Sequence, residues 1–371
     1  FNGNDITSLR LIADAKGDSL HATVNVESEP LNVDLTLHGT WPEKGDSLIA
    51  ALDMDLANAQ LEPLGFMPYP LNVEGQWTGK AAFSAEGRGS ADLVAEGLRL
   101  SNAKSDFVFE HFVAHAYLGT DSTAVELDSD ALTLTYHTNI APDSLLPRSK
   151  EKLATFFSAD TTFMPTPGKH MDLAITLPRT EWLTGLVVPQ LRAIQLETFT
   201  GRYDSDTDEL KLDIVLPYLD YDSTRVNDLS VTIDAVGPKL NGSVGLQRAQ
   251  HDQFYVEGLT LDAVTAGGLL TTTLRIVQNE VERYRIGTEL RAENDMRLLH
   301  IQEELVLNEQ TWSADAQNVL RFSKRTMEAE HFTLSSGAEQ VQLSTGAEHL
   351  TVALKQFEIG TLARIVSTMD S

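Results

Sequence analysis

The segment from Tyr203 to Glu209 is the run of side chains that most resembles a chemical site, because aspartates alternate there with hydroxyl residues. A calcium-binding loop can begin in this way, since carboxylate oxygens are ligands that Ca²⁺ prefers. Such a loop also needs glycine at its sixth position and a bidentate glutamate at its twelfth. Here those positions hold Glu209 and Val215. We therefore interpret the run as a polar hairpin turn before a strand.

Two histidines, His111 and His115, have the spacing of a zinc-protease motif. That motif is HExxH on a helix, with the glutamate as general base. Here no glutamate lies between the histidines and the surrounding pattern is that of a strand, so we interpret them as two histidines on one strand face. The glycine-containing segments 87–90 and 267–268 lack the Lys-Ser/Thr of a phosphate-binding loop, and no G-x-S-x-G nucleophile motif is present.

Composition narrows the remaining function classes. The chain of 371 residues has no cysteine, which excludes disulfides, thiol nucleophiles and cysteine-ligated metals. Its formal net charge is −26 without a Lys/Arg-rich stripe, so its surface repels nucleic acid and anionic membranes. No apolar run approaches the roughly 20 residues of a membrane-spanning helix. We expect no enzyme activity, no cofactor, no metal and no nucleic-acid partner.

The elements that must position any site are short strands. Apolar residues recur at every second position, as in Leu31–Leu37 and Leu210–Leu216, which is the pattern of strands with one face toward an apolar environment and one toward water. Roughly 20 or more such runs follow at the spacing of all-β architectures, and alternating βαβ units are absent. A loose cassette, Glu-Gly-Leu-x-Leu, occurs at 96–100 and again at 257–261.

Short helices are expected at only a few places. The segment Leu56–Phe66 has helix-like spacing, 180–191 is a short stretch interrupted by Pro189, and 359–369 closes the chain. The strongest amphipathic pattern is 143–157, which would act as a cap or hinge. We thus predict a first β-repeat half at 1–142, this amphipathic helix at 143–157 and a second β-repeat half at 158–371.

Several stretches resemble the AsmA-like family, and within it the TamB-like translocation and assembly module proteins. A leucine-rich short segment, 61–65, precedes glycine-punctuated strand pairs at 70–75 and 79–87. An Ala-Glu-Gly-Leu-Arg-Leu-Ser-Asn run follows at 95–102. A Trp…Asn-x-Leu-x-Phe unit lies at 312–322, and two Phe-centred strands lie at 331–334 and 356–359. The resemblance implies a middle segment of such a protein, without its membrane anchor.

The resemblance implies a mainly β fold in which an elongated repeat sheet, with a few short helices, curls into an open, taco-like groove or solenoid. It also implies a periplasmic segment of an inner-membrane-anchored protein of a diderm bacterium. Such proteins form bridges along which phospholipids are thought to pass between the inner and outer membranes, or they aid outer-membrane protein assembly. The implied partners are phospholipid acyl chains and, through parts absent from this chain, an outer-membrane assembly barrel.

An acyl-chain shelter needs an apolar lining and no catalyst, because the lipid headgroup stays in water. A phospholipid has roughly 30 acyl methylenes, each costing about 0.8 kcal/mol in water. Alternating aliphatic residues supply such a lining. The candidate lining residues are Leu132, Leu134, Leu173, Ile175, Leu177, Leu210, Leu212, Ile214, Val231 and Ile233.

Two other functions remain open. A structural or adhesive β-repeat spacer would use the same alternation to build closed cores without lipid cargo. An enzyme on a β-helix that acts on acidic polysaccharide would need clustered basic and aromatic residues, and basic residues are sparse here. We favour the lipid shelter, with the spacer as the alternative.

Overall fold

The computed structural model describes residues 7–40, 47–84, 87–140, 166–293, 296–323, 326–346 and 349–356, together with Ser144, Lys152 and Phe156. The described residues form 27 strands and one short π-helix. The strands belong to one long antiparallel sheet that does not close on itself. The predicted mainly β chain with an elongated sheet is therefore confirmed.

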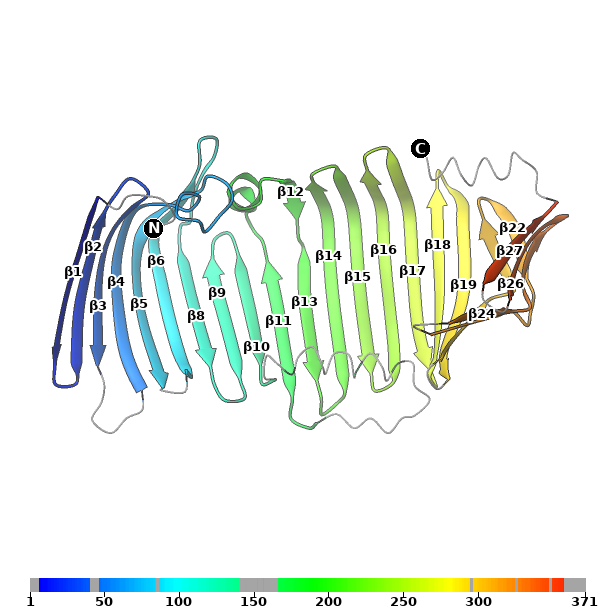
Figure 1. Ribbon diagram of the computed structural model, residues 1–371, viewed down its shortest axis with the longest axis horizontal. Coiled ribbons are helices and arrows are strands. Elements are labelled where there is room, and N and C mark those ends of the chain that lie inside the picture. The colour runs from blue at the N-terminus through cyan, green and yellow to red at the C-terminus, as the bar shows by residue number, and fades with distance from the viewer. Residues whose placement is uncertain are drawn as a thin grey trace. The chain divides into compact units, whose positions relative to one another are not determined.

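Within each unit, most strands that follow each other in the chain lie side by side (Figure 1). Those of the earlier part are β1 (Ser8–Lys16), β2 (Ser19–Glu27), β3 (Leu31–Thr40), β4 (Ser47–Gln60), β5 (Asn72–Ser84), β6 (Gly89–Ser101), β7 (Asp106–Val108), β8 (Phe112–Leu118), β9 (Thr123–Ser129), β10 (Thr133–Thr138), β11 (His170–Thr176), the π-helix η1 (Leu183–Val187) and β12 (Leu191–Gln195). Those of the later part are β13 (Thr198–Asp204), β14 (Glu209–Tyr221), β15 (Thr224–Val236), β16 (Lys239–His251), β17 (Phe254–Ala266), β18 (Leu269–Gln278), β19 (Val281–Glu293), β20 (Met296–Ile301), β21 (Glu304–Leu307), β22 (Gln310–Ala314), β23 (Val319–Phe322), β24 (Met327–Glu330), β25 (Phe332–Ser336), β26 (Glu339–Thr345) and β27 (Leu350–Lys355).

The chain divides into two compact units. The first takes the described residues of 1–142, 169–201 and 220–222, and the second takes those of 143–168, 202–219 and 223–371. Most of the predicted helix at 143–157 lies outside the described residues, as does the predicted helix at 359–369. The three-part division proposed from the sequence therefore stays a prediction.

The helix predicted at Leu56–Phe66 is wrong. Residues up to Gln60 continue β4, and turns follow at 61–65. Where β4 meets β5, Leu56 opposes Gly75 and the next register pair begins at Ala59, so the strand contains a bulge. A bulge inserts an extra residue into one strand, so that two side chains three residues apart along that strand point to the same face of the sheet. The spacing of Leu56 and Ala59, which suggested a helix, is the signature of this bulge.

The first unit is an antiparallel meander. Strands β1 to β6 pair in order, β8 follows β6, and β9, β10 and β11 complete the series, while the short β7 pairs with the far end of β6. A two-residue turn connects β1 to β2 in the first unit, and turns of the same length connect several hairpins of the second unit. Asn279 and Glu280, with φ of 52° and 65°, join β18 to β19, and both residues of a type I′ turn need such positive φ.

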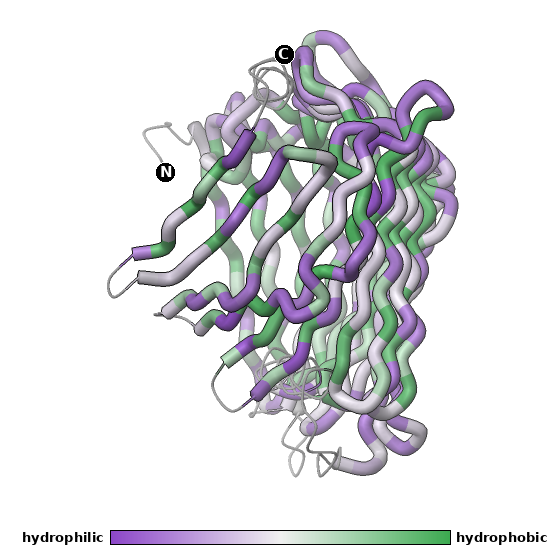
Figure 2. Tube along the Cα trace, turned by 90° about the vertical axis from the view of Figure 1, so that its right-hand side faces the viewer, coloured by the Kyte–Doolittle hydropathy of each residue, from purple (hydrophilic) through white to green (hydrophobic). Residues whose placement is uncertain are grey.

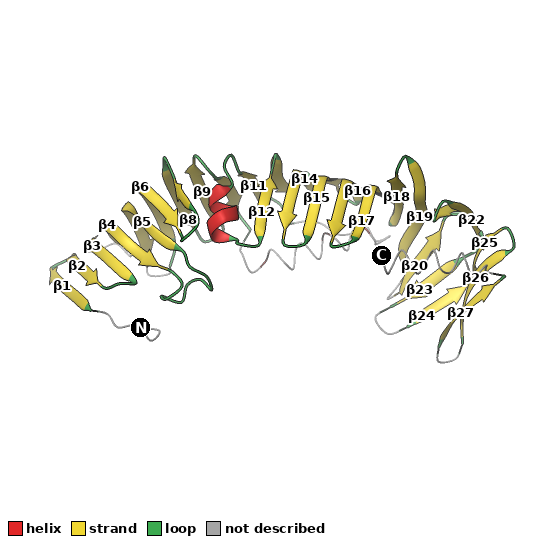
Figure 3. Cartoon of the chain, turned by 90° about the horizontal axis from the view of Figure 1, so that it is seen from above, coloured by secondary structure: helices red, strands yellow, loops and turns green. Residues whose placement is uncertain are grey.

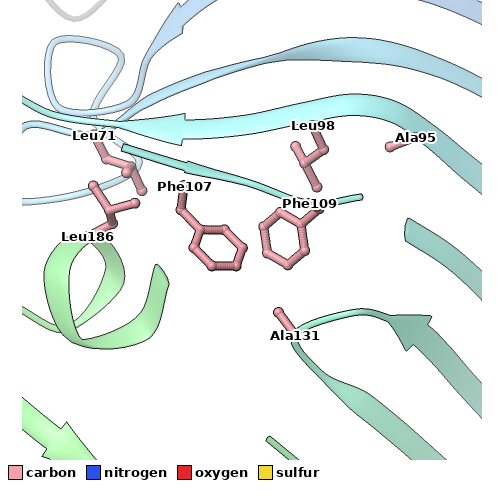
Figure 4. Close-up of a cluster of buried hydrophobic side chains, with 7 residues drawn as sticks. All are labelled: Leu71, Ala95, Leu98, Phe107, Phe109, Ala131 and Leu186. Atoms are coloured by element: carbon pink, nitrogen blue, oxygen red, sulfur yellow. The ribbon is translucent and has the colours of Figure 1, made fainter. Parts of the chain in front are cut away.

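One end of the sheet in the first unit packs against η1, the red element in Figure 3, and forms a closed core. Figure 4 shows Phe107 and Phe109 side by side, with Leu186 of η1 next to Leu71. The two phenylalanine rings meet edge to face at 4.9 Å between centroids. Leu186 is fully buried, so this short helix is fixed by packing more than by its own few hydrogen bonds.

The second unit ends in a two-layer core. Strands β15 to β19 pair in order, and β19 then pairs with two strands, β20 near its C-terminal end and β21 near Tyr284. One branch continues through β23 and β24, and the other through β22, β25, β26 and β27. Their apolar faces meet, because Leu305 and Trp312 of one branch pack with Leu320 of the other.

Asn318 fixes the start of one branch. Its side chain is completely buried; its amide nitrogen donates to the carbonyls of Ile301 (2.7 Å) and Asp315 (2.6 Å), and its amide oxygen accepts from the backbone N–H of Ile301 (2.8 Å). These bonds satisfy the polar atoms of a side chain that is buried away from water.

Candidate functional site, the apolar face of the sheet

The first unit has one apolar face that crosses ten strands. Residues directly opposed in an antiparallel pair point to the same side of the sheet, so the register defines rows of side chains. The central row is Ala13, Ala22, Leu37, Leu52, Gly79, Leu93, Ala114, Leu127, Leu134 and Ile175. The next row is Ala15, Leu20, Gly39, Ala50, Ala81, Ala91, Ala116, Val125, Tyr136 and Leu173. We call these rows, with the row of Leu11, Val24, Leu35, Met54 and Trp77 on the other side, the first apolar face.

The opposite face of the first unit is polar. Its matching row is Asp14, His21, His38, Ala51, Lys80, Asp92, His115, Glu126, Thr135 and Ala174. Exposed histidine–carboxylate hydrogen bonds form there, such as His115 Nδ1 to Asp92 at 2.5 Å and His137 Nε2 to Glu126 at 2.7 Å. This side of the sheet therefore faces solvent.

The second unit repeats the division from β15 to β19. One row is Val231, Val244, Leu261, Leu274 and Ile286, and its neighbour is Leu229, Leu246, Leu259, Ile276 and Tyr284. We call these rows the second apolar face. The row on the other side of the same strands is Thr232, Ser243, Asp262, Thr273 and Gly287. Apolar and polar residues alternate along the strands in Figure 2 as this register requires.

The aliphatic residues of both apolar faces from β2 to β19 are mostly half-buried, whereas true core residues of this chain are almost fully buried. Leu305 is 1% exposed and Trp312 3% exposed in the two-layer core. By contrast, Leu37, Leu134, Val244 and Leu261 are all half-buried. Outside strand pairing, η1 contacts β12 and packs against the core around Phe107 in the first unit, and the two branches that follow β19 pack against each other in the second. Among these described elements, none lies as a second layer over the central rows.

All ten residues predicted to line a groove are half-buried. In the first unit Leu134 opposes Ile175, and Leu173 opposes Tyr136, so these three lie together on the first apolar face. Leu132 and Leu177 flank the same strand pair outside its ends. In the second unit Val231 and Ile233 lie on β15, and the remaining three lie on β14: Leu210, Leu212 and Ile214.

The sequence reasoning missed most of the residues that share these faces. In the first unit Leu52 and Leu93 lie in the central row, and in the second unit Val244, Leu261 and Leu274 extend the row that begins at Val231. Their signal is the same period-two alternation. What the sequence does not give is the register, which decides whether two alternating strands place their apolar residues in one row.

The repeated Glu-Gly-Leu-x-Leu cassette has a backbone explanation. Gly97 in β6 and Gly258 in β17 both have a left-handed conformation, with φ of +60° and +57°. Glycine reaches this region without steric cost, and within a strand it marks a local kink. Asp228 of β15 also has a left-handed backbone, with φ of +48°, and, like the two glycines, it directly precedes a leucine. The cassette is therefore a kink element and not a binding motif.

Two arginine–aspartate pairs of the first unit, Arg179 with Asp130 and Arg99 with Asp106, hold neighbouring segments together. Arg179 Nη1 lies 2.5 Å from Asp130, and its guanidinium lies 4.3 Å from the Phe107 ring. Burial raises the pKa of Asp130, but hydrogen bonds from the Glu110 backbone N–H and from Arg179 outweigh it and leave the pKa below its usual value. A hydrogen bond from Arg99 likewise lowers the pKa of the exposed Asp106 carboxyl.

The segments that resembled chemical sites have structural roles. Residues 205–208 form the turn between β13 and β14, in which Asp204 Oδ1 accepts the backbone N–H of Asp206 at 2.8 Å. His111 and His115 pair with different carboxylates, those of Asp128 and Asp92. In the part of the chain that the structure describes, no three His, Cys, Asp or Glu side chains gather in a way that could hold a metal ion.

The buried lysine next to this turn is an unexpected feature. Lys152 is 5% exposed, and its Nζ donates to the Asp208 carboxylate at 2.6 Å and to the Gly237 carbonyl at 2.9 Å. Its ammonium also lies 5.4 Å from the centre of the buried Phe156 ring. These contacts attach Lys152 and Phe156, two residues of the predicted amphipathic segment, to hairpin ends of the second unit.

Comparisons of the chain with known protein families, with curated proteins and with solved structures find no match. The resemblance to the AsmA-like family therefore rests on the sequence stretches given above. Among the helices of the described residues, none has the length and apolarity needed to cross a membrane. What the fold and the candidate site define is an antiparallel sheet that has one apolar and one polar face over β1 to β11 in the first unit and over β15 to β19 in the second.

Proposed function

We propose that this chain is a segment of a periplasmic, bridge-like protein that shelters lipid acyl chains on its apolar sheet faces, for phospholipid transport between the inner and outer membranes and for outer-membrane biogenesis. The observation on which the proposal depends is the first apolar face, whose rows cross ten strands while the described elements leave the central rows half-buried. The resemblance to TamB-like proteins supports the same function. On this proposal the sheet is curled into an open groove.

The size of the face suits acyl chains. Two rows across ten strands about 4.8 Å apart, and a third row across five of them, with the rows about 7 Å apart, give an apolar footprint of about 450 Å². Monomeric proteins rarely expose contiguous apolar patches larger than a few hundred Å² unless the patch binds something. At about 25 cal/mol per Å², covering that area of lipid is worth about 11 kcal/mol, about half of the roughly 24 kcal/mol that two acyl chains cost in water.

The chemistry of the face also suits a moving ligand. Its rows contain mainly aliphatic side chains, with the aromatic Trp77 and Tyr136, and the histidine–carboxylate contact of His115 with Asp92 lies on the polar side. A lipid on such a surface meets repeated, similar contacts from strand to strand. Its headgroup needs no pocket because it stays in water.

The direct test is mass spectrometry of an organic extract of the purified chain, beside native mass spectrometry of the intact protein. Phospholipid at one or more copies per chain supports the proposal. Because the chain has no cysteine, a single cysteine can also carry an environment-sensitive fluorophore. Leu261→Cys on the second apolar face should shift to the blue on adding phospholipid, and Thr260→Cys, one residue away on the polar face, should not.

A structural or adhesive spacer is the second candidate, and the two-layer core of the second unit favours it. There the chain covers its own apolar face, with Leu305, Trp312 and Phe332 all buried. A clean organic extract from well-folded protein, with no fluorescence change at Leu261→Cys, would replace the lipid proposal with this one.

A further inference from the structure

The polar face of the first unit contains a pair of histidines on neighbouring strands. His21 of β2 opposes His38 of β3 in the register, so both side chains point to the same side of the sheet. Their Nδ1 atoms lie 3.1 Å apart, their ring centroids lie 4.5 Å apart, and both side chains are exposed. All ten histidines of the chain are in the part that the structure describes, and only these two contact each other.

The short distance between the two Nδ1 atoms brings together lone pairs that a metal ion can use. Only one proton fits between two nitrogens that are hydrogen-bonded to each other, so at least one Nδ1 is the bare acceptor nitrogen of a neutral imidazole. A neutral imidazole can also carry its single proton on Nε2. When both histidines do so, both Nδ1 lone pairs face the same small space. The bare nitrogen of a neutral imidazole is the commonest side-chain ligand of metals.

We propose that His21 and His38 bind one divalent transition-metal ion such as Zn²⁺ through their Nδ1 atoms, with water in the remaining coordination positions. Imidazole nitrogens lie about 2.0 to 2.1 Å from such an ion, so two nitrogens 3.1 Å apart subtend an angle of about 95 to 100° at the metal. This angle lies between the roughly 90° of octahedral sites and the roughly 109° of tetrahedral sites. Ring rotations complete the geometry, because the backbone register already places the two nitrogens.

The neighbouring strands favour a cation at this place. Asp14 of β1 opposes His21 on one side, and the small Ala51 of β4 opposes His38 on the other. Among the described strands, no Lys or Arg is directly opposite either histidine. Asp14 does not complete a three-ligand group with the histidines, so its carboxylate contributes charge and not a metal bond. The formal net charge of −26 also attracts cations to the chain.

The sequence alone gives no signal for this pair. The two histidines are 17 positions apart, and the register of β2 with β3 brings them together. The metal site goes beyond the proposed function and is independent of it, because the pair lies on the side of the sheet opposite the first apolar face. A metal ion there would link β2 to β3 and would leave coordination positions open to water or to a ligand from another molecule.

Calorimetric titration of the metal-free, tag-free chain with Zn²⁺ at neutral pH tests the site. We expect one ion per chain with a dissociation constant of about 10 to 100 μM, because two imidazoles supply half the ligands of a structural zinc site. His21→Asn and His38→Asn each keep a polar side chain but remove one ligand, so each should raise the dissociation constant by at least about tenfold. Asp14→Asn should raise it by about two- to fivefold, because only a nearby exposed charge is lost.

His115→Asn is the matched control. His115 lies on the same polar face, but its Nδ1 contacts the Asp92 carboxylate at 2.5 Å instead of a second imidazole. This variant should bind Zn²⁺ within about twofold of the unaltered chain, because it leaves both proposed ligands in place. All of these exposed substitutions should leave the circular dichroism spectrum unchanged, which separates a lost ligand from a lost fold.

Chemical modification locates the ion. Diethyl pyrocarbonate reacts with the bare nitrogen of a neutral imidazole, and a histidine with a metal on Nδ1 and a proton on Nε2 has no such nitrogen. Peptide mass spectrometry should therefore show that Zn²⁺ slows the modification of His21 and His38. The modification of His115 and His137, which contact carboxylates, should be unchanged.

Three results would overturn the proposal. One is the absence of Zn²⁺ binding up to about 1 mM, well above the expected dissociation constant. Another is binding that survives in both His21→Asn and His38→Asn, which would place the ion elsewhere on the acidic surface. The third is equal protection of all four modified histidines, which would mean that the ion has no fixed site. None of these results depends on lipid binding, so the proposed function stands or fails separately.

Discussion

The two copies of the Glu-Gly-Leu-x-Leu cassette give a matched pair of substitutions, Gly97→Ala and Gly258→Ala. Both glycines have positive φ, so alanine at either site should lower the free energy of unfolding by about 1 to 2 kcal/mol because its backbone must adopt a left-handed conformation. The space around them differs. A Cβ added at Gly97 would meet nothing within 4 Å, whereas one at Gly258 would lie 2.4 Å from the Val277 carbonyl oxygen.

The clash at Gly258 cannot be relieved by a side-chain rotation, because the Val277 oxygen belongs to the backbone of β18. Overpacking of this kind costs about 1 to 3 kcal/mol more. We therefore expect Gly258→Ala to lower the free energy of unfolding by about 2 to 5 kcal/mol, and Gly97→Ala by about 1 to 2 kcal/mol.

Urea unfolding of both variants, followed by circular dichroism and by hydrogen exchange in β6 and β17, measures the difference. Hydrogen exchange is needed because the glycines lie in different units and it reports local opening strand by strand. Asp228→Gly is the reverse control, since glycine removes the strain at φ of +48° and should stabilise the second unit. Equal losses for the two alanine variants, or a larger loss at Gly97, would refute the steric argument.

Three further predictions concern buried polar groups. Asn318→Ala should cost about 3 kcal/mol of unfolding free energy because three buried hydrogen bonds are lost, while the exposed Asn241→Ala should cost less than about 0.5 kcal/mol; urea midpoints compare them, and equal costs would contradict the network. Lys152→Met should cost about 3 kcal/mol because the buried ammonium bonds both to the half-buried Asp208 carboxylate and to the Gly237 carbonyl, which would lose their donor. Lys211→Met removes an exposed ammonium from a carboxylate of similar exposure and should cost less than about 1 kcal/mol; melting temperatures measure both, and equal costs would contradict the role of the buried lysine. Asp130→Asn should destabilise the first unit at pH 7. Because the folded pKa of Asp130 lies below its unfolded value, the stabilisation that the Asp130 carboxylate provides is present above about pH 4 and is lost as the pH falls through the folded pKa. Urea midpoints of the variant and the unaltered chain at pH 7 and pH 3 check this, and an equal loss of stability at both pH values would contradict it.

The strands could be predicted from the sequence where period-two alternation is unbroken. The run Leu31–Leu37 lies in β3 as expected, and Leu210–Leu216 lies in β14. Prediction failed at the bulge in β4, where Leu56 and Ala59 lie on one face with a spacing that a helix would also produce. Local sequence cannot separate these two cases, because the bulge is defined by its pairing with another strand.

The candidate site could be predicted only strand by strand. Alternation shows that Leu134 and Leu132 share one side, but the opposition of Leu134 to Leu127 and Ile175 comes from the hairpin registers. A shift of one residue would turn every apolar side chain to the other face. The row of ten residues through Leu134 is therefore a property of the sheet and not of any one segment.

Alternation alone also cannot tell an open face from a core, and the second unit shows why. Strands β15 to β19 and strands β20 to β26 have the same kind of apolar alternation, yet Leu261 is half-buried and Leu305 is 1% exposed. The difference arises at β19, which pairs with both β20 and β21, so the sheet branches and two apolar faces meet. Before the branch, the described strands have one layer and no such partner. Whether this chain shelters a ligand or only covers itself is thus decided by where the sheet branches, and a lipid should be found on β15 to β19 and excluded from the core around Leu305.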